Sequence, residues 1–142
     1  MSVDVKYRTE ATATGGGRNG SASLASGMLT MTMATPKELG GSGKGHNPEE
    51  LFALGYAACF LGAMRAAANM QKLGTVPDDA TVTANVGIGP RGDGGFGIAV
   101  ELKIALPGVE PELAQKMVDA GHFVCPYSHA TKGNIDVTLT LV

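Results

Sequence analysis

Apolar residues surround every side of a predicted helix between Asn47 and Gly74, and this stretch is the expected centre of the fold. Asn47 is typical of a helix N-cap, Pro48 of the first helical position, and Gly74 of a C-terminal stop. A helix that is apolar all round is buried by its own chain or by a second copy. The uncharged run from Leu51 to Met64 is shorter than the roughly 20 residues that a bilayer requires, so we expect no membrane association.

Alternation of apolar and polar residues predicts strands before this helix. Val3, Val5 and Tyr7 alternate with charged residues, which predicts a first strand with one buried face. Ser21 to Ala25 and Met28 to Ala34 predict two short strands joined as a hairpin at Ser26-Gly27. Three strands therefore precede the central helix.

After the helix, the pattern predicts a second hairpin, a second helix and a last strand. The hairpin comprises residues 82–88 and 98–106, with a glycine-rich turn between them. Pro111 opens the second helix, which should stop near Val124 because Pro126 disfavours helical geometry at the residue before it. The last strand runs from Ile135 to Leu141. This order predicts an α+β fold with mainly antiparallel sheets around a long buried central helix.

Composition limits the classes of function. The chain has 142 residues, a length typical of a single domain, so we expect one domain over residues 1–142. Its net charge of −2 comes from scattered charges of both signs, without a basic run that could follow a phosphate backbone, so we expect no nucleic-acid partner. The first ten residues lack the apolar segment of a secretory signal, which favours a cytoplasmic location.

Two glycine-rich motifs have the spacing of nucleotide sites but lack the required context. GIGPRG at residues 87–92 matches G-x-G-x-x-G, yet it leads into a strand pattern where a dinucleotide site requires a helix. GSGKGH at residues 41–46 has Gly45 where a phosphate loop requires Ser or Thr. We interpret the first as a hairpin turn and the second as a flexible loop.

The two cysteines are the strongest candidates for chemistry. In a reducing compartment stable disulfides are rare, so the cysteines are either inert core residues or chemically active. Cys59 lies among apolar residues and could be a core residue, whereas Cys125 stands where a helix must end, in the polar sequence CPYSH. His122, Cys125 and His129 could also ligate zinc with Cys59 as a fourth ligand, but a second close cysteine pair is missing.

Three motifs together resemble the organic hydroperoxide resistance (Ohr) family within the OsmC-like group. NPEELFALGYAACF and VCPYSHATKGNI are similar to its two cysteine motifs, and TEATATGGGRNG is similar to its N-terminal arginine segment. The resemblance implies the OsmC-like fold and an intertwined homodimer. It also implies a thiol peroxidase without a bound cofactor, which reduces organic hydroperoxides to alcohols and is recycled by a lipoylated protein or another dithiol reductant.

The resemblance also implies roles for four residues. Cys59 would be the peroxidatic cysteine and Cys125 the resolving cysteine, and the two would form an intramolecular disulfide. Arg18 would stabilise the Cys59 thiolate and the peroxide, and Glu49 would orient Arg18. His129 stands where the family more often has Asn, and Lys132 stands where Arg is common. These two departures could alter the resolving loop.

Elementary electrostatics supports a cation beside Cys59. A thiol with a pKa near 8.5 is only a few per cent ionised at pH 7, and apolar surroundings lower that fraction further. A guanidinium about 4 Å away, at an effective dielectric constant near 20, contributes about 4 kcal/mol, or roughly three pKa units. Arg18 suits this role because its planar fork can bind Glu49 while it faces a sulfur or peroxide oxygen.

Apolar side chains near the cysteines indicate the substrate class. Walls formed by aromatic residues would favour alkyl or fatty-acyl hydroperoxides over hydrogen peroxide, and the expected substrate-binding residues are Phe52, Tyr56, Phe60 and Tyr127. Three alternatives stay open: an OsmC-branch peroxidase with other substrates, a small apolar ligand-binding protein with incidental cysteines, and a zinc-stabilised module.

The spacing of Glu49 and Cys59 poses a geometric problem. On one continuous helix, residues ten positions apart lie about 15 Å apart along the axis, so an Arg18 bound to Glu49 could not readily reach Cys59. Either the helix breaks near Gly55 or the site uses a second chain. A dimer whose long helices cross at Gly55 or Gly62 would also explain the all-round apolarity. Our hypothesis is that Arg18 and Glu49 of one subunit complete the cysteine site of the other.

Overall fold

The structure is a computed structural model that describes residues 2–142. The chain forms two compact units, Met1–Pro48 and Glu49–Val142, which we call the N-terminal unit and the C-terminal unit. The expectation of a single domain stays a prediction. The α+β class is confirmed, because each unit contains a three-stranded sheet and the C-terminal unit adds the long helices.

The N-terminal unit is an antiparallel sheet with the strand order β1-β2-β3. Its elements are β1 (Ala11–Thr14), β2 (Ser21–Leu24), β3 (Thr30–Thr32) and the 3-10 helix η1 (Lys37–Leu39). Pairing of β2 with β3 confirms the hairpin predicted from the sequence. The turn between β1 and β2 needs glycine at Gly20, because a Cβ there would collide with the main-chain oxygen of Thr14.

The strand predicted at Val3, Val5 and Tyr7 is wrong. These three residues belong to no strand and are exposed, and Tyr7 keeps 79% of its surface. The first strand lies further along the chain, at Ala11–Thr14, where the glycine turn after Thr14 brings β2 back as a pairing partner. Alternation alone predicted a strand, but a strand also requires a partner edge.

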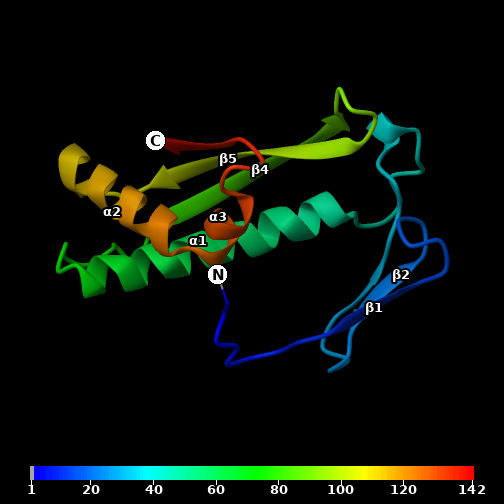
Figure 1. The fold of residues 1–142 in the computed structure, drawn as a ribbon, viewed down its shortest axis with the longest axis horizontal. Coiled ribbons are helices and arrows are strands. Elements are labelled where there is room, and N and C mark those ends of the chain that lie inside the picture. Colours follow the sequence, from blue (N-terminus) through cyan, green and yellow to red (C-terminus); the bar gives the residue numbers. More distant parts are fainter. Residues whose placement is uncertain (1) are drawn as a thin grey trace. The chain divides into compact units, whose positions relative to one another are not determined.

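The C-terminal unit packs a sheet against helices (Figure 1). Its elements are α1 (Pro48–Met70), β4 (Thr81–Pro90), β5 (Phe96–Ala105), α2 (Pro111–Val124), α3 (Pro126–Thr131) and β6 (Val137–Leu141). The strand order is β4-β5-β6; β4 and β5 form the predicted antiparallel hairpin, and β6 runs parallel to β5. The sheets are therefore mainly antiparallel, as expected, with one parallel pair.

The predicted central helix is confirmed as α1. It begins at Pro48, directly after Asn47, and continues without a break through Gly55 to Met70. Gly74 has φ of 98°, a left-handed conformation that glycine adopts without strain and that follows the end of the helix. The continuity of α1 removes one of the two solutions to the spacing problem, namely a break near Gly55.

One face of α1 forms the centre of the core. Its buried side chains pack with the inward residues of β5 and with α2, and the largest of them are Tyr56, Phe60 and Met64. By length and composition α1 could also span a membrane, with a mean hydropathy of 1.5 over its most apolar window. Packing of this face against sheet and helix is the arrangement of a core helix.

The opposite face of α1 is apolar and exposed. At intervals of four residues it carries Leu54, Ala58, Gly62, Ala66 and Met70, all exposed, with Leu54 keeping 69% of its surface. No side chain lies within 4 Å of a Cβ placed on Gly62. The apolar residues on all sides of α1 therefore form two faces. The chain buries one of them and leaves the other exposed.

Helix α3 was not expected from the sequence. Helix α2 ends at Val124 as predicted, but Pro126 then occupies the first position of a new short helix, where its missing N–H costs nothing. Cys125 is thus both the C-cap of α2 and the N-cap of α3. The same proline that ends one helix begins the next.

Candidate active site

The two cysteines meet between α1 and the junction of α2 with α3. The Cys125 Sγ lies 3.5 Å from the Cys59 Sγ, in hydrogen-bonding geometry, although the residues are 66 positions apart. Cys59 is half-buried in the middle of α1, whereas Cys125 has no exposed surface. The main-chain N–H of Cys125 donates to the Gly121 oxygen at 2.8 Å, which fixes the sulfur to the end of α2. Small molecules from solvent therefore encounter Cys59 before Cys125.

Burial raises the pKa of the Cys59 thiol above its ordinary value. A hydrogen bond from the main chain of Tyr127 acts in the opposite direction, and the adjacent Cys125 adds to the rise. Within the C-terminal unit, none of the groups that shift this pKa is a cation. These surroundings together favour the thiol of Cys59 over its thiolate.

Three aromatic rings form a cluster between α1 and α3. Phe52, Tyr56 and Tyr127 lie with their centroids 5.7–5.8 Å apart, and Phe52 meets Tyr56 edge to face. Tyr127 rests on α1 at Gly55, where a Cβ would come within 2.9 Å of the Tyr127 hydroxyl oxygen. Glycine at this position thus lets α3 approach α1 closely enough for the two sulfurs to meet.

The four expected substrate-binding residues differ in exposure. Phe52 is half-buried and Tyr127 keeps 38% of its surface, whereas Tyr56 and Phe60 have no exposed surface. Tyr56 and Phe60 pack in the hydrophobic core. Direct contact with a substrate stays a prediction for all four residues.

A chain of buried polar groups lies beside the cysteines, and sequence reasoning missed it. The Tyr56 hydroxyl lies 2.9 Å from the Ser128 Oγ and 3.3 Å from the Thr131 Oγ1. The Ser128 Oγ also lies 2.9 Å from the His122 Nδ1. The only sequence signal was the position of Ser128 and Thr131 three residues apart after Pro126, which places both on one face of a short helix.

His122 is largely neutral at physiological pH. Burial lowers its pKa below 6.5, the Lys132 charge lowers it further, and the Asp119 charge partly opposes both effects. The ring also lies 6.4 Å from that of Phe60, centroid to centroid. A neutral imidazole carries one N–H, which can be donated to the Ser128 hydroxyl.

Arg18 and Glu49 occupy different units. Arg18 lies exposed in the turn between β1 and β2, and Glu49 lies in the first turn of α1. Because α1 is continuous, Glu49 is about 15 Å from Cys59 along the helix axis. The spacing problem posed by the sequence therefore persists within one chain.

The zinc alternative finds no support in the geometry. Among residues 2–142, no three His, Cys, Asp or Glu side chains gather as metal ligands would. The His122 Nδ1 faces Ser128, and His129 is exposed on α3.

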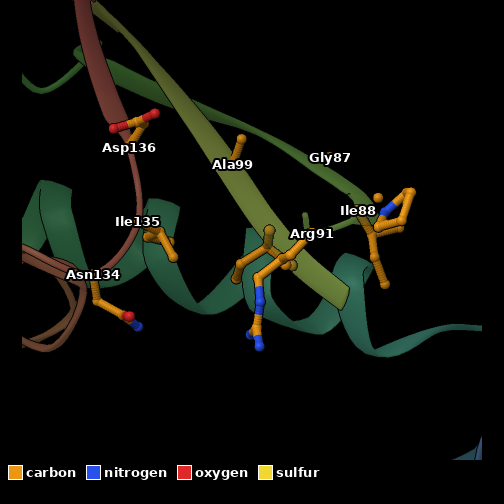
Figure 2. A pocket seen from close by; sticks show the side chains of 11 residues that line it. Gly87, Ile88, Arg91, Ala99, Asn134, Ile135 and Asp136 are labelled. Carbon is orange, nitrogen blue, oxygen red and sulfur yellow. The ribbon is translucent and has the colours of Figure 1, made fainter. Parts of the chain in front are cut away.

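A separate hollow of about 500 Å³ lies at the turn end of the β4-β5 hairpin (Figure 2). Its lining comes from β4, β5, the turn between them and the segment before β6, and includes Arg91, Asn134 and Asp136. The Arg91 guanidinium is bound by both carboxylate oxygens of Asp93, at 2.9 and 3.0 Å. This hollow holds neither cysteine, and its guanidinium is already paired.

Comparison with known proteins gives consistent matches over nearly the whole chain. Residues 41–140 match the family model described as OsmC-like protein. The organic hydroperoxide resistance protein of Xanthomonas axonopodis pv. citri (strain 306) is 55% identical over 138 residues, covering 96% of this chain and 95% of that protein.

Solved structures with a similar fold carry related names. A crystal structure of an organic hydroperoxide resistance protein from Elizabethkingia anophelis has a TM-score of 0.90 at 46% identity, covering 98% of each chain. That of the organic hydroperoxide resistance protein OhrB of Bacillus subtilis has a TM-score of 0.85 at 38% identity, covering 97% of this chain and 100% of that one.

Proposed function

We propose a thiol peroxidase function from this premise: the chain belongs to the OsmC-like family and, within it, to the organic hydroperoxide resistance proteins. Membership supports a role in organic hydroperoxide resistance and a peroxidase-type activity. The observation that carries the proposed mechanism is the 3.5 Å separation of a half-buried Cys59 from a fully buried Cys125.

The reaction proceeds in two steps. The Cys59 thiolate attacks the outer peroxide oxygen, the O–O bond breaks, and the alcohol leaves with a proton while Cys59 becomes a sulfenic acid. The Cys125 thiol then attacks the sulfenic sulfur, a disulfide forms and water is released. Because a disulfide measures about 2.05 Å, the sulfurs need to approach by only about 1.5 Å from their present 3.5 Å.

Activation of Cys59 is assigned to Arg18 and Glu49 across a homodimer. Burial raises the pKa of Cys59, so a guanidinium is needed to stabilise the thiolate. The continuity of α1 favours a second subunit as the source of the Arg18 and Glu49 pair. The exposed apolar face of α1 gives that subunit a surface to pack against.

The substrate is an alkyl or fatty-acyl hydroperoxide. The exposed parts of Phe52 and Tyr127 give the entrance an apolar wall, which an alkyl chain contacts favourably and hydrogen peroxide does not. The disulfide is then reduced by dihydrolipoamide, a lipoylated protein or another dithiol in the cytoplasm, and no bound cofactor takes part.

A peroxidase assay on the purified protein tests this function. Cumene hydroperoxide is supplied with dihydrolipoamide or with thioredoxin as the reductant, and Cys59→Ser and Cys125→Ser are compared with the natural chain. We expect rapid turnover with dihydrolipoamide, none with Cys59→Ser, and a single unrecycled reaction with Cys125→Ser. Unchanged turnover by Cys59→Ser would refute the role of Cys59, and absence of turnover by the natural chain would favour a ligand-binding protein with incidental cysteines. A preference for hydrogen peroxide would refute the substrate class.

Mixed dimers test whether subunits share a site. A Cys59→Ser chain and an Arg18→Ala chain, each inactive by itself, are unfolded together and refolded. If each site combines Cys59 of one subunit with Arg18 of the other, the mixed dimers regain one intact site and measurable turnover. Complete inactivity of the mixture would show that Arg18 acts within its own chain.

A further inference from the structure

The buried polar chain beside the cysteines links three helices at one hydroxyl. Ser128 on α3 contacts Tyr56 of α1 and His122 of α2, each at 2.9 Å. Ser128 keeps 2% of its surface and Tyr56 none, so water does not compete for these bonds. The hydrogen bonds of Ser128 therefore fix α3 to α1, which carries Cys59, and to α2, which ends at Cys125.

The hydrogen-bond directions follow from counting protons. Thr131 donates its hydroxyl proton to the main-chain oxygens of Tyr127 and Ser128, at 3.0 and 3.1 Å. The Thr131 hydroxyl therefore accepts from the Tyr56 hydroxyl, which donates its only proton there. The Tyr56 oxygen must then accept from the Ser128 hydroxyl, which also has only one proton. Ser128 in turn accepts from the Nδ1–H of His122. One continuous chain thus runs from His122 through Ser128 and Tyr56 to Thr131.

Both ends of the cysteine site depend on the helix that this chain holds. Cys125 directly precedes α3, and its main-chain oxygen accepts from the N–H of His129 at 2.9 Å, within the first turn of α3. Tyr127 on the same helix supplies the main-chain hydrogen bond that lowers the pKa of Cys59. On α1, Cys59 lies three residues after Tyr56, nearly one turn along the same helix.

We propose that Ser128, with Tyr56 and His122, positions the resolving cysteine: the hydroxyl chain holds α3 so that Cys125 captures the Cys59 sulfenic acid before a second peroxide does. The competing reaction is balanced, because the sulfenic acid takes one oxygen from a second hydroperoxide to become a sulfinic acid, and a second alcohol is released. This inference rests on the proposed peroxidase function. In this role the three residues act through the position of Cys125 and not on the peroxide itself.

The test separates the two chemical steps in one sample. Reduced protein without reductant receives an equimolar amount of cumene hydroperoxide and is quenched at increasing times. Peroxide loss reports the first step, and the Cys59 to Cys125 disulfide, measured by mass spectrometry, reports the second. The variants are Ser128→Ala and Tyr56→Phe, and the matched control is Ala130→Ser, on the same helix but exposed.

In Ser128→Ala we expect disulfide formation to slow about 10-fold to 100-fold, which is the effect of misplacing a reacting group by about 1 Å. The factor by which peroxide loss slows should be smaller than this factor by about 10-fold or more. With excess peroxide, sulfinic acid at Cys59 accumulates in this variant. Tyr56→Phe shows the same pattern to a smaller or equal degree, and the double variant is no slower than Ser128→Ala because both changes break one chain. Ala130→Ser behaves as the natural chain does.

Two results would overturn the inference. Disulfide formation at the natural rate in both Ser128→Ala and Tyr56→Phe would show that the chain does not position Cys125. An equal slowing of both steps would show a general structural defect. Failure of the natural chain itself to form the disulfide would refute the proposed function, which is a distinguishable outcome.

Discussion

Replacing Gly121 by alanine would press α2 away from α1 where Gly121 faces Met64. A Cβ at Gly121 would lie 2.9 Å from the Met64 Cβ and 3.0 Å from the Met64 Cα. Carbon atoms pack favourably at about 3.5–4.0 Å, so the helices must separate by about 0.6 Å or more. The contact involves main-chain and Cβ atoms, so a change of Met64 rotamer cannot relieve it.

Two opposing terms set the magnitude. Overpacking in a core lowers the free energy of unfolding by about 1–3 kcal/mol, whereas replacing glycine by alanine inside a helix raises it by about 1 kcal/mol. We therefore expect Gly121→Ala to lower the free energy of unfolding by up to about 2 kcal/mol, or roughly 4–8 °C in melting temperature for a chain of this size. Because the Gly121 oxygen accepts from the Cys125 N–H at 2.8 Å, the shift also moves the resolving sulfur.

Thermal unfolding and the rate of disulfide formation measure the two consequences. The matched control is Gly95→Ala, whose Cβ would lie 2.7 Å from Nη2 of Arg91. That atom is the far end of a flexible side chain that can move aside, so the control should lose little stability and keep its rate of disulfide formation. A gain of stability in Gly121→Ala, or natural disulfide formation in a destabilised Gly121→Ala, would refute the reasoning.

Two further predictions concern the dimer and pH. If a second α1 packs across Gly62, Gly62→Ala should weaken self-association measured by analytical ultracentrifugation; a more stable monomer, by about 1 kcal/mol, would show instead that the face is solvated. The folded state lowers the pKa of His122 below 6.5, so the unfolded state takes up this proton first on acidification. The contribution of neutral His122 to stability is thus present above pH 6.5 and is lost as the pH falls toward the lowered pKa. Denaturant titrations of the natural chain and His122→Asn should diverge in this way, and parallel curves would contradict the assignment.

Much of the C-terminal unit could be predicted from the sequence because local signals and packing agree there. The apolar run with Asn47-Pro48 before it and Gly74 after it specified α1, and strict alternation specified the β4-β5 hairpin. Pro126 located the end of α2. The start of α3 was missed because Pro126 was interpreted only as a helix breaker.

Other features depend on contacts that a sequence does not display. Val3, Val5 and Tyr7 alternate as a strand does, but no partner edge meets them. The parallel direction of β6 follows from the path of α2 and α3 between β5 and β6. The cysteine pair was found through motifs, whereas the bond between Tyr56 and Ser128 joins residues 72 positions apart and has no local signature.

The central claim is that Cys59 and Cys125 form one redox pair, and peptide mapping after a single oxidation tests it most directly. Reduced protein is treated with an equimolar amount of organic hydroperoxide, its remaining thiols are alkylated, and the digested peptides are analysed by mass spectrometry. We predict that both thiols disappear together and that Cys59 and Cys125 of the same chain are joined in one disulfide-linked peptide pair. Persistence of a free Cys125 beside an oxidised Cys59, or a disulfide between the Cys59 residues of two chains, would contradict the account.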